Sequence, residues 1–387
     1  MKKIKILHVT GAMNRGGAEV MLMDIYRNIS ENFHFDFLIN YKRKLGVVKG
    51  DFDEEIQANG AQIKYIPTQW DVGPKKYAFE FEKICKELGI PDIVHIHMNA
   101  KSGVIAWAAK KAGIKTVIVH SHADLKFRGN LVSRVLSQLE LQFQKWLIAK
   151  YADYYWGCSN EANASLFYER LLTKNKTAVI NNAIDTKAFQ MVSDEAVEKL
   201  RKSYNITENT LVLGNVGRIV SHKNVLFIIE VLNELQKKGL DVVFVFAGRA
   251  DQPDYLQRIF QKAEEYKVTE RIRYLDVRED VPVVMHSFDV FVGPALKEGF
   301  GLVAVEAQAA GLPCYLYKGF PKTVDMNLDL VTFFDSFSVS EWTDAIVYNI
   351  SKNKTIAKEK IGEKIMSKGF DIEINTKKIE ELYSKIV

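Results

Sequence analysis

Short runs of apolar, mostly β-branched residues alternate with longer amphipathic stretches along the whole chain. In the first half these runs predict strands at residues 4–9, 35–39, 63–66, 93–96, 117–120 and 154–157. The cycle then restarts, with strands predicted at residues 211–216, 242–247, 272–275, 290–292 and 314–317. Near-continuous apolar runs are typical of buried parallel strands joined by crossover helices. The pattern therefore predicts an α/β protein with two doubly wound, Rossmann-like domains in tandem.

The domain boundary is expected in the turn-rich segment 181–185, which lies between an apolar run and a charged helix. We place an N-terminal domain at residues 1–185 and a C-terminal domain at 186–387, a division in keeping with the usual size of domains. The last helix, at about 372–387, is the segment that would pack back on the N-terminal domain. Ligands of such sheets bind outside the carboxyl ends of the strands, so two facing domains predict an interdomain cleft.

Composition excludes several classes of protein. A chain with 47% hydrophobic and 26% charged residues is neither intrinsically disordered nor of low complexity. Cys85, Cys158 and Cys314 lie far apart without a C-x-x-C pair, so they are expected to be reduced thiols of a cytoplasmic protein. The apolar run 4–9 is too short and too polar for a signal peptide, and no uncharged apolar run is long enough to span a bilayer.

The positive charge is unevenly distributed. The formal net charge is +5, but residues 1–185 carry +7 and the remainder −2. Residues 101–150 account for this excess, with nine basic and two acidic side chains. This is too modest for a nucleic-acid-binding protein and fits an anionic membrane surface or a diphosphate-bearing partner.

One predicted helix in this basic segment has apolar residues at helical spacing: Val132, Val135, Leu136, Leu139, Phe143, Trp146 and Leu147. An interfacial helix would have this pattern, and so would a helix packed on its own domain. We favour packing on the domain, because only Arg134, Lys145 and Lys150 flank the row. The preceding basic loop with Lys126 and Arg128 is then the expected membrane contact.

Two loops after predicted strands have residues suited to phosphate. Gly16 and Gly17 follow the first strand and open a helix, so backbone N–H groups there can approach an anion. A tight turn without a ligand is the alternative, and the spacing is not G-x-G-x-x-G. Arg218 and Lys223 follow the first strand of the second half and offer a rigid fork and a mobile charge to a diphosphate. Solvated surface cations are the alternative there.

The segment 297–313 is the most informative. Gly299 and Gly301 permit close approach of the backbone at the start of an apolar helix. Glu298 precedes these glycines and Glu306 lies on the helix. Carboxylates suit hydroxyl-rich ligands, because a carboxylate can accept two hydrogen bonds from a vicinal diol.

These motifs together resemble the retaining, family-four glycosyltransferases of the GT-B fold, particularly the bacterial capsule and exopolysaccharide members. The resemblance covers almost the whole chain in order and rests on Gly16-Gly-Ala-Glu19, the run 179–185 with Phe189, Gly217-Arg218 with Lys223, and Glu298-x7-Glu306 around Gly-Phe-Gly. It implies transfer of a hexosyl unit from a nucleotide sugar, expected to be UDP-linked, with retained anomeric configuration. The implied acceptor is a polyprenyl-diphosphate-linked glycan of capsular or extracellular polysaccharide biosynthesis. The protein would be peripheral on the inner face of the cell membrane.

The resemblance also implies roles for individual residues. Arg218 and Lys223 would bind the donor diphosphate, and Glu306 the nucleotide ribose. Glu298 would contact the donor sugar, beside the backbone of the Gly299-Phe300-Gly301 run. From the other domain, the loop with Gly16 and Gly17 would close over the diphosphate.

A histidine beside the reacting sugar is also implied, and the sequence 119–124 fits its place. We favour His122 over His120, because His120 is expected to be the last residue of its strand. A histidine held by backbone groups, with a purely structural role, is the alternative.

No metal and no other cofactor are expected. His95 and His97 are expected to point to opposite faces of their strand, which would prevent them from chelating one ion. Asp51 and Asp53 spell D-x-D, a motif of some metal-dependent glycosyltransferases, but they lie where carboxylates stabilise a helix N-terminus. Two other functions remain open: a sugar-nucleotide epimerase of the GT-B fold and a non-catalytic nucleotide-sugar-binding module.

Overall fold

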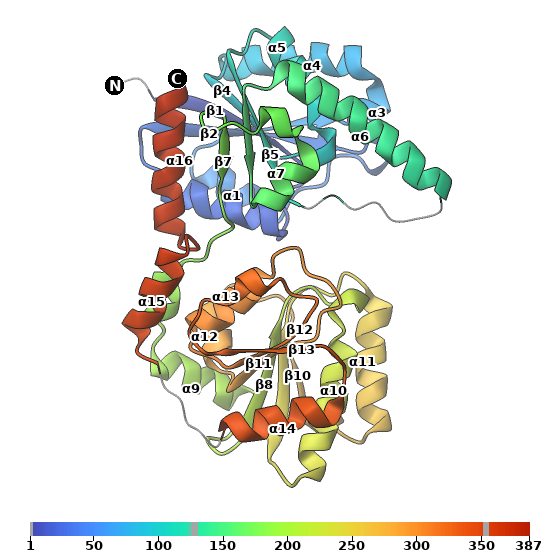
Figure 1. Cartoon of the computed structure of the whole chain (residues 1–387), viewed down its shortest axis with the longest axis vertical. Helices are drawn as coiled ribbons and strands as arrows, with labels where there is room; N and C mark the ends of the chain where they lie inside the picture. Colours follow the sequence, from blue (N-terminus) through green and yellow to red (C-terminus); the bar gives the residue numbers. More distant parts are fainter. Residues whose placement is uncertain (1–2, 124, 126–130, 351–355) are drawn as a thin grey trace. The chain divides into compact units, whose positions relative to one another are not determined.

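The computed structural model describes residues 3–123, 125, 131–350 and 356–387. The chain divides into two compact units (Figure 1). Unit 1 runs to Ala183 and includes the last segment, Ile372–Val387, whereas unit 2 is Ile184–Asp371. Each unit contains one parallel sheet with helices on both faces, so the predicted pair of doubly wound α/β domains is confirmed.

Unit 1 contains a seven-stranded sheet in the order β3-β2-β1-β4-β5-β6-β7. Its strands are β1 (Ile4–Thr10), β2 (Phe33–Tyr41), β3 (Ile63–Pro67), β4 (Ile93–Ile96), β5 (Thr116–Ser121), β6 (Tyr154–Gly157) and β7 (Thr177–Val179). Its described helices are α1 (Gly17–Asn28), α2 (Asp53–Ala58), α3 (Gln69–Val72), α4 (Pro74–Leu88), α5 (Ser102–Lys111), α6 (Leu131–Tyr151), α7 (Asn160–Leu166) and α16 (Ile372–Ile386).

The two faces of this sheet pack against different helices. Side chains alternate between faces along a strand. Leu7 and Val9 of β1 therefore pack in the core beneath α4, α5 and α6. Ile6 lies on the opposite face, in the core that α1 and α16 cover, where the buried Tyr383 of α16 contacts Trp156. Helix α16, the last helix in the sequence, thus helps to cover one face of a sheet that contains β1, the first strand.

Unit 2 contains a six-stranded sheet in the order β10-β9-β8-β11-β12-β13. Its strands are β8 (Leu211–Val216), β9 (Val242–Ala247), β10 (Ile272–Tyr274), β11 (Val290–Gly293), β12 (Cys314–Tyr317) and β13 (Val331–Phe334). Its described helices are α8 (Thr186–Gln190), α9 (Asp194–Ser203), α10 (Val225–Lys237), α11 (Pro253–Glu265), α12 (Val281–His286), α13 (Leu302–Ala309), α14 (Val339–Ile350) and α15 (Lys358–Ser367).

Two strands, β7 and β13, were not predicted from the sequence. Both are edge strands, of three and four residues, and all their residues are partly exposed. A short edge strand needs no continuous apolar run, because only one neighbouring strand and part of each face cover it. The buried-run criterion therefore identifies the central strands together with the edge strands β3 and β10, and misses these two.

Candidate functional site

Lys223 and Glu298, two predicted site residues, are in direct contact in unit 2. Lys223 ends a short 3-10 turn after β8, and Glu298 lies in the loop after β11, the neighbouring strand. The ammonium group of Lys223 forms an ion pair with Oε1 of Glu298, and both side chains are largely buried. A backbone hydrogen bond of 2.8 Å, from Leu296 N to His222 O, ties the two loops together. An anion that binds Lys223 therefore shares it with Glu298.

Arg218 lies at the end of β8 and is more exposed than Lys223. Its guanidinium donates a hydrogen bond of 3.3 Å to Asp251, with 52% of the side chain accessible. Arg249 also binds Asp251, at 2.7 Å, and holds the pKa of that carboxyl below its usual value, with Arg218 adding to the effect. The sequence places Asp251 in a loop where the resemblance implies nucleobase binding, but it does not predict the pairing with Arg218, because only the adjacent ends of β8 and β9 bring the two residues together.

The glycine-rich loop before α13 could present backbone N–H groups to an anion. Gly301 is the N-cap residue with φ +85°, and a Cβ there would lie 2.5 Å from the Phe320 ring, so glycine is required. The first N–H groups of a helix lack intrahelical partners and lie at its positive end. The side chain of Phe300 stacks on Phe370 at 4.8 Å and is partly buried against the core. Glu306, partly buried, lies on α13 itself.

In unit 1, Gly16 and Gly17 connect β1 to α1, as predicted. The D-x-D carboxylates stabilise this region. Asp51 accepts a hydrogen bond of 3.0 Å from the backbone N–H of Arg15, and the buried Asp53 accepts from the Tyr65 hydroxyl at 2.5 Å. Both acidic residues therefore have a structural role beside the glycine loop.

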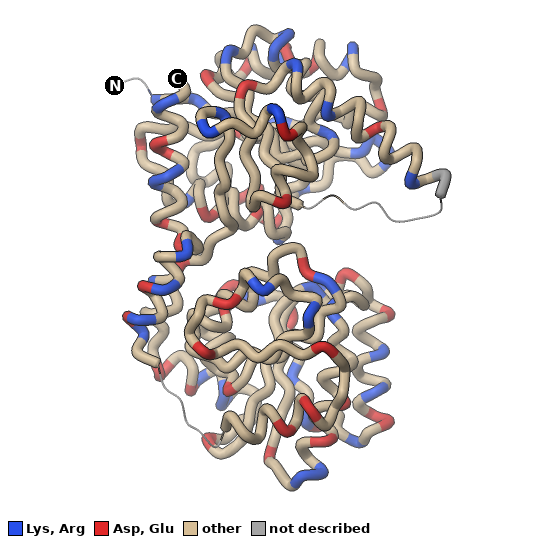
Figure 2. The backbone as a smooth tube through the Cα atoms, viewed as in Figure 1, with Lys and Arg blue, Asp and Glu red and all other residues tan. Residues whose placement is uncertain are grey.

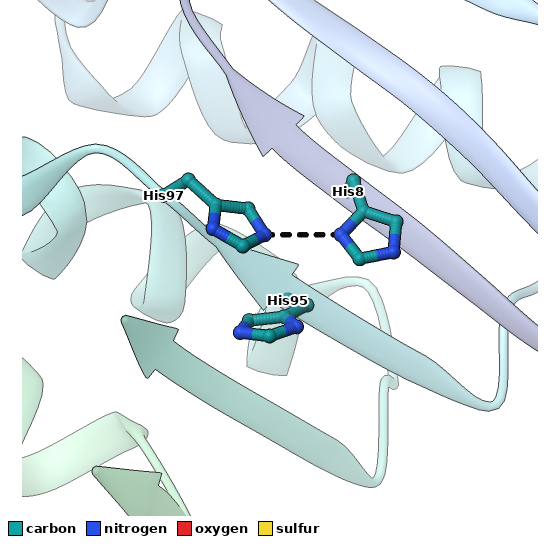
Figure 3. A group of neighbouring side chains, drawn as sticks. All are labelled: His8, His95 and His97. Carbon is teal, nitrogen blue, oxygen red and sulfur yellow. Dashed lines mark hydrogen bonds between the residues drawn. The ribbon is translucent and has the colours of Figure 1, made fainter. Parts of the chain in front are cut away.

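His122 lies just beyond β5 and is joined to two further histidines. Its Nε2 is 2.8 Å from Nδ1 of His97, and Nε2 of His97 is 3.0 Å from Nδ1 of His8. Figure 3 shows His97 and His8 pointing toward one another across β4 and β1, with His95 beside them. The backbone N–H of His122 donates to Asn99 Oδ1 at 2.7 Å. These contacts orient the His122 ring.

A second chain of hydrogen bonds lies deeper on the same face of the sheet. The hydroxyl of Tyr383 is 2.6 Å from Nδ1 of His95, and Nε2 of His95 is 3.2 Å from Nδ1 of His120. His120 lies inside β5 and is fully buried. The carboxyl edge of the sheet is therefore occupied by His122, with His120 beneath it.

The expectation for His95 and His97 is wrong. Side chains two residues apart in an extended chain lie on the same face of a sheet, and the two ring centroids are 4.2 Å apart. One side-chain nitrogen from each of His8, His95 and His97 lies within 4.8 Å of the other two, and the same holds for His97, His120 and His122. The described residues therefore include two candidate metal-ligating groups that share His97.

Burial keeps these five rings neutral at neutral pH. It lowers the pKa of His8 to about 3 and that of His122 to about 4. Burial, and then the neighbouring histidines, hold the pKa values of His95, His97 and His120 well below the usual value. Each ring therefore has one nitrogen that donates and one that accepts.

Most of the predicted apolar row on α6 is exposed, so the interpretation that this row packs on its own domain is wrong except at Leu147. The helix buries a stripe that includes Leu141 and Ile148, and Leu147 is the member of the predicted row that joins it. The exposed members of the row are Val135, Leu136, Leu139, Phe143 and Trp146. The loop with Lys126 and Arg128 lies outside the described residues. None of the described helices is both long and apolar enough to cross a bilayer.

An apolar pocket of about 640 Å³ adjoins this row in unit 1. It is lined by Val72, Gly73, Pro74, Lys75, Lys76, Val104, Trp107, Phe143, Leu147 and Tyr151. Lys75 and Lys76 are exposed at its rim, and Lys150 lies over the rings of Trp146 and Tyr151. Figure 2 shows further basic residues along α4, α5 and α6. The region combines apolar surface with positive charge.

Comparisons with known proteins extend over nearly the whole chain. Family models described as Glycosyltransferase Family 4 and Glycosyl transferases group 1 match residues 15–188 and 196–365. The putative glycosyltransferase EpsF of Bacillus subtilis (strain 168) is 30% identical, over 98% of this chain and 96% of that protein. The capsular polysaccharide biosynthesis glycosyltransferase CapH of Staphylococcus aureus is 24% identical over 98% of both chains.

A third relative has a name that specifies donor and acceptor. The Escherichia coli UDP-Gal:alpha-D-GlcNAc-diphosphoundecaprenol alpha-1,3-galactosyltransferase is 29% identical over 76% of both chains. Among solved structures, Anabaena Alr3699/HepE in complex with UDP is similar with a TM-score of 0.78 and 21% identity. That similarity covers 99% of this chain and 100% of that one, and it concerns the fold.

The buried histidines predict how stability depends on pH. In the unfolded chain His8 takes up a proton near its usual pKa of 6.5, but in the fold only near 3, so stability falls as pH decreases through this interval. Replacing His8 with Phe removes one such group. When the pH is lowered from about 7 to about 5, the free energy of unfolding should decrease in both proteins. We expect this decrease to be about 2 kcal/mol smaller in His8→Phe than in the parent. Urea unfolding at both pH values measures the difference, and equal losses would contradict the prediction.

Proposed function

Because this chain belongs to the family-four glycosyltransferases of the GT-B fold, of the capsule and exopolysaccharide type, and acts in polysaccharide biosynthesis, we propose that it uses a UDP-sugar. It transfers a hexosyl unit to a polyprenyl-diphosphate-linked glycan, with retention of configuration and without a metal ion. The observation that carries this proposal is the contact of Lys223 with Glu298 beside the start of α13. The name of the Escherichia coli relative, with its UDP-linked donor and diphosphoundecaprenol acceptor, supports it.

The proposed donor site stabilises the departing diphosphate. When the bond between the sugar carbon and the phosphate oxygen breaks, negative charge accumulates on the diphosphate. Lys223, Arg218 and the N–H groups at the start of α13 supply positive charge there. Glu298 accepts hydrogen bonds from sugar hydroxyls, and Glu306 from the ribose diol. Lys223 thereby connects the sugar-binding carboxylate to the leaving group.

The acceptor hydroxyl attacks from the face that the diphosphate leaves, and its proton passes to the departing phosphate oxygen. This sequence retains the configuration and needs no enzyme nucleophile. The proposal gives His122 the role of a residue that contacts the reacting sugar, and His97 orients its ring.

The proposed metal independence rests on the same charges. Lys223 and Arg218 supply the charge that a divalent ion supplies in other transferases. Asp51 and Asp53 are engaged by Arg15 N–H and Tyr65 in unit 1, and the proposal gives them no metal.

The acceptor is proposed to bind unit 1. The exposed apolar row on α6 suits the interface of the inner leaflet, and the pocket next to it suits an isoprenoid chain. Lys75, Lys76 and Lys150 would attract anionic headgroups and the lipid diphosphate. The protein is then peripheral on the cytoplasmic face of the membrane.

The first test is a transfer assay with a panel of UDP-, GDP- and ADP-sugars and an undecaprenyl-diphosphate-linked acceptor, with and without EDTA. We expect a glycosylated lipid with the anomeric configuration of the donor, formed from a UDP-sugar at an unchanged rate in EDTA. Product from donor alone would indicate an epimerase, and binding without turnover a binding module. Activity lost in EDTA and restored by Mn²⁺ would return Asp51 and Asp53 to consideration as ligands.

Removing the phosphate-binding charges should affect UDP more than uridine. UDP should bind with a larger binding free energy than uridine because of its phosphates. For Lys223→Ala and for Arg218→Ala we expect this difference in binding free energy to shrink by about 1.5–3 kcal/mol, the scale of hydrogen bonds to charged groups. Turnover should fall strongly in both variants. Lys237→Ala, an exposed lysine of unit 2, is the matched control. Calorimetry that shows equal losses for UDP and uridine would indicate a folding defect instead.

The ribose contact is tested by Glu306→Ala. We expect UDP binding to weaken by about 1.5–3 kcal/mol, because a carboxylate that accepts hydrogen bonds from the diol is lost. The variant should bind UDP and 2′-deoxy-UDP with nearly equal affinity. Glu363→Ala, an exposed residue of unit 2, serves as the control. Unchanged UDP affinity in folded Glu306→Ala would remove this role.

Charge reversal at the rim of the pocket tests the membrane surface. The variant with Lys75→Glu, Lys76→Glu and Lys150→Glu should lose about 1 kcal/mol of attraction to anionic vesicles for each lysine removed, in a salt-dependent manner. Transfer to the lipid acceptor should fall, whereas UDP affinity stays within about twofold because exposed charges are screened over about 8 Å. A matched triple reversal of exposed Lys44, Lys174 and Lys176 is the control. Equal sedimentation of both variants with vesicles would exclude this surface.

A further inference from the structure

Five of the eight histidines of this chain form one cluster at three adjacent strands, with four of them buried and His122 partly buried. His8 lies on β1, His95 and His97 on and just after β4, and His120 and His122 on and just after β5. His95 and His97 are two residues apart, as are His120 and His122, and His8 is in register with His95 on the neighbouring strand. All five rings therefore project to the same face of the sheet. The cluster contains more histidines than are needed to orient the ring of His122.

Three of these rings have nitrogens that meet at the carboxyl edge of β4 and β5. Nδ1 of His97 and Nε2 of His122 face each other at 2.8 Å. His120 has its Nδ1 engaged by His95, so its Nε2 is the atom that it can offer. That Nε2 is buried and has no hydrogen-bond partner among the described groups. One nitrogen from each of the three residues lies within 4.8 Å of the others.

The geometry points to a divalent transition-metal site at which His97, His120 and His122 are the ligands. Three imidazole nitrogens with an open fourth position form a donor set that Zn²⁺ uses, and Co²⁺ and Ni²⁺ also accept imidazole. Mg²⁺ and Ca²⁺ prefer oxygen ligands and would be excluded. The ion would have a structural role, and the inference does not depend on the proposed transfer mechanism, which uses no metal ion.

The surroundings of the three ligands support the assignment. Metal-ligating histidines usually have their second nitrogen held by a hydrogen bond, which fixes the ring. The second nitrogen of His97 is held by His8 at 3.0 Å, and that of His120 by His95 at 3.2 Å. His95 is in turn held by the Tyr383 hydroxyl at 2.6 Å. The two inner histidines thus act as positioning residues for His97 and His120, whereas Nδ1 of His122 is buried without a hydrogen-bond partner among the described groups.

The other candidate group, His8 with His95 and His97, is less suitable (Figure 3). Both ring nitrogens of His95 are already engaged, by Tyr383 and by His120. The group also lies deeper in the sheet, whereas His122 is only partly buried and gives an ion access. A metal at the outer group would engage the Nε2 of His122 that otherwise faces His97.

Metal binding is measured directly on the full-length chain, freed of metal with EDTA and dialysed. Co²⁺ is added in steps while visible absorption is recorded, and Zn²⁺ is then added as a competitor and also measured by calorimetry. We expect a Co²⁺ spectrum of low coordination number that Zn²⁺ removes and excess Mg²⁺ does not. The parent protein showing neither the spectrum nor heat of Zn²⁺ binding would overturn the proposal.

Variants identify the ligands. His122→Ala and His97→Ala should abolish the Co²⁺ spectrum, and His8→Phe should weaken binding by about 10- to 100-fold, the effect of losing an orienting hydrogen bond. His34→Ala and His286→Ala, outside the cluster, should bind like the parent.

Folding of each variant is checked by circular dichroism. If His97→Ala does not fold, His122→Asn, beyond the strand, tests the assignment by itself. Full binding in folded His122→Ala, with loss in His8→Phe, would place the ion at the inner group and overturn the assignment. Because the readout is metal binding, its failure leaves the transfer assay unaffected.

Discussion

Parallel pairing of the strands is the constraint on which both candidate sites depend. When every strand of a sheet runs in the same direction, all carboxyl ends lie at one edge, and the loops that follow them meet there. In unit 2 this brings Lys223 to Glu298, 75 residues further along the chain. In unit 1 it brings His8, His97 and His122 into one hydrogen-bonded row. The chemistry of each site is therefore a property of strand order more than of local sequence.

The central strands and the glycine loops could be predicted because their physical requirements are local. A buried strand needs an apolar run, and the start of α13 needs glycine at the φ of +85° that Gly301 adopts. Helix α6 shows the limit of such reasoning. Its sequence contains more than one apolar stripe, and helical periodicity does not say which stripe meets the sheet. Leu141 and Ile148 are buried, whereas Leu136 and Leu139, equally apolar, face outward.

The partners of the site residues were harder to foresee, because each depends on a contact between distant segments. Asp251 binds Arg218 only because Gly248, at the end of β9, lies against the backbone of Gly217 at the end of β8. The histidine cluster was within reach of the sequence, since His95 and His97 share a face by the period of a strand. The contact of His95 with Tyr383 could not be predicted, because nothing near His95 in the sequence indicates that Tyr383 binds it.

That last contact has a consequence for synthesis of the protein on the ribosome. His95 and its partner Tyr383 are 288 residues apart, and the whole of unit 2 is translated between them. Until α16 emerges, the nascent first sheet lacks a helix that covers one of its faces, and Phe33 and Phe35, which pack against Tyr383, lack this cover. Domains usually fold in the order in which they are made, but here the N-terminal unit is completed last. Vectorial folding is therefore interrupted, and an incomplete chain presents an aromatic surface of the kind that chaperones bind.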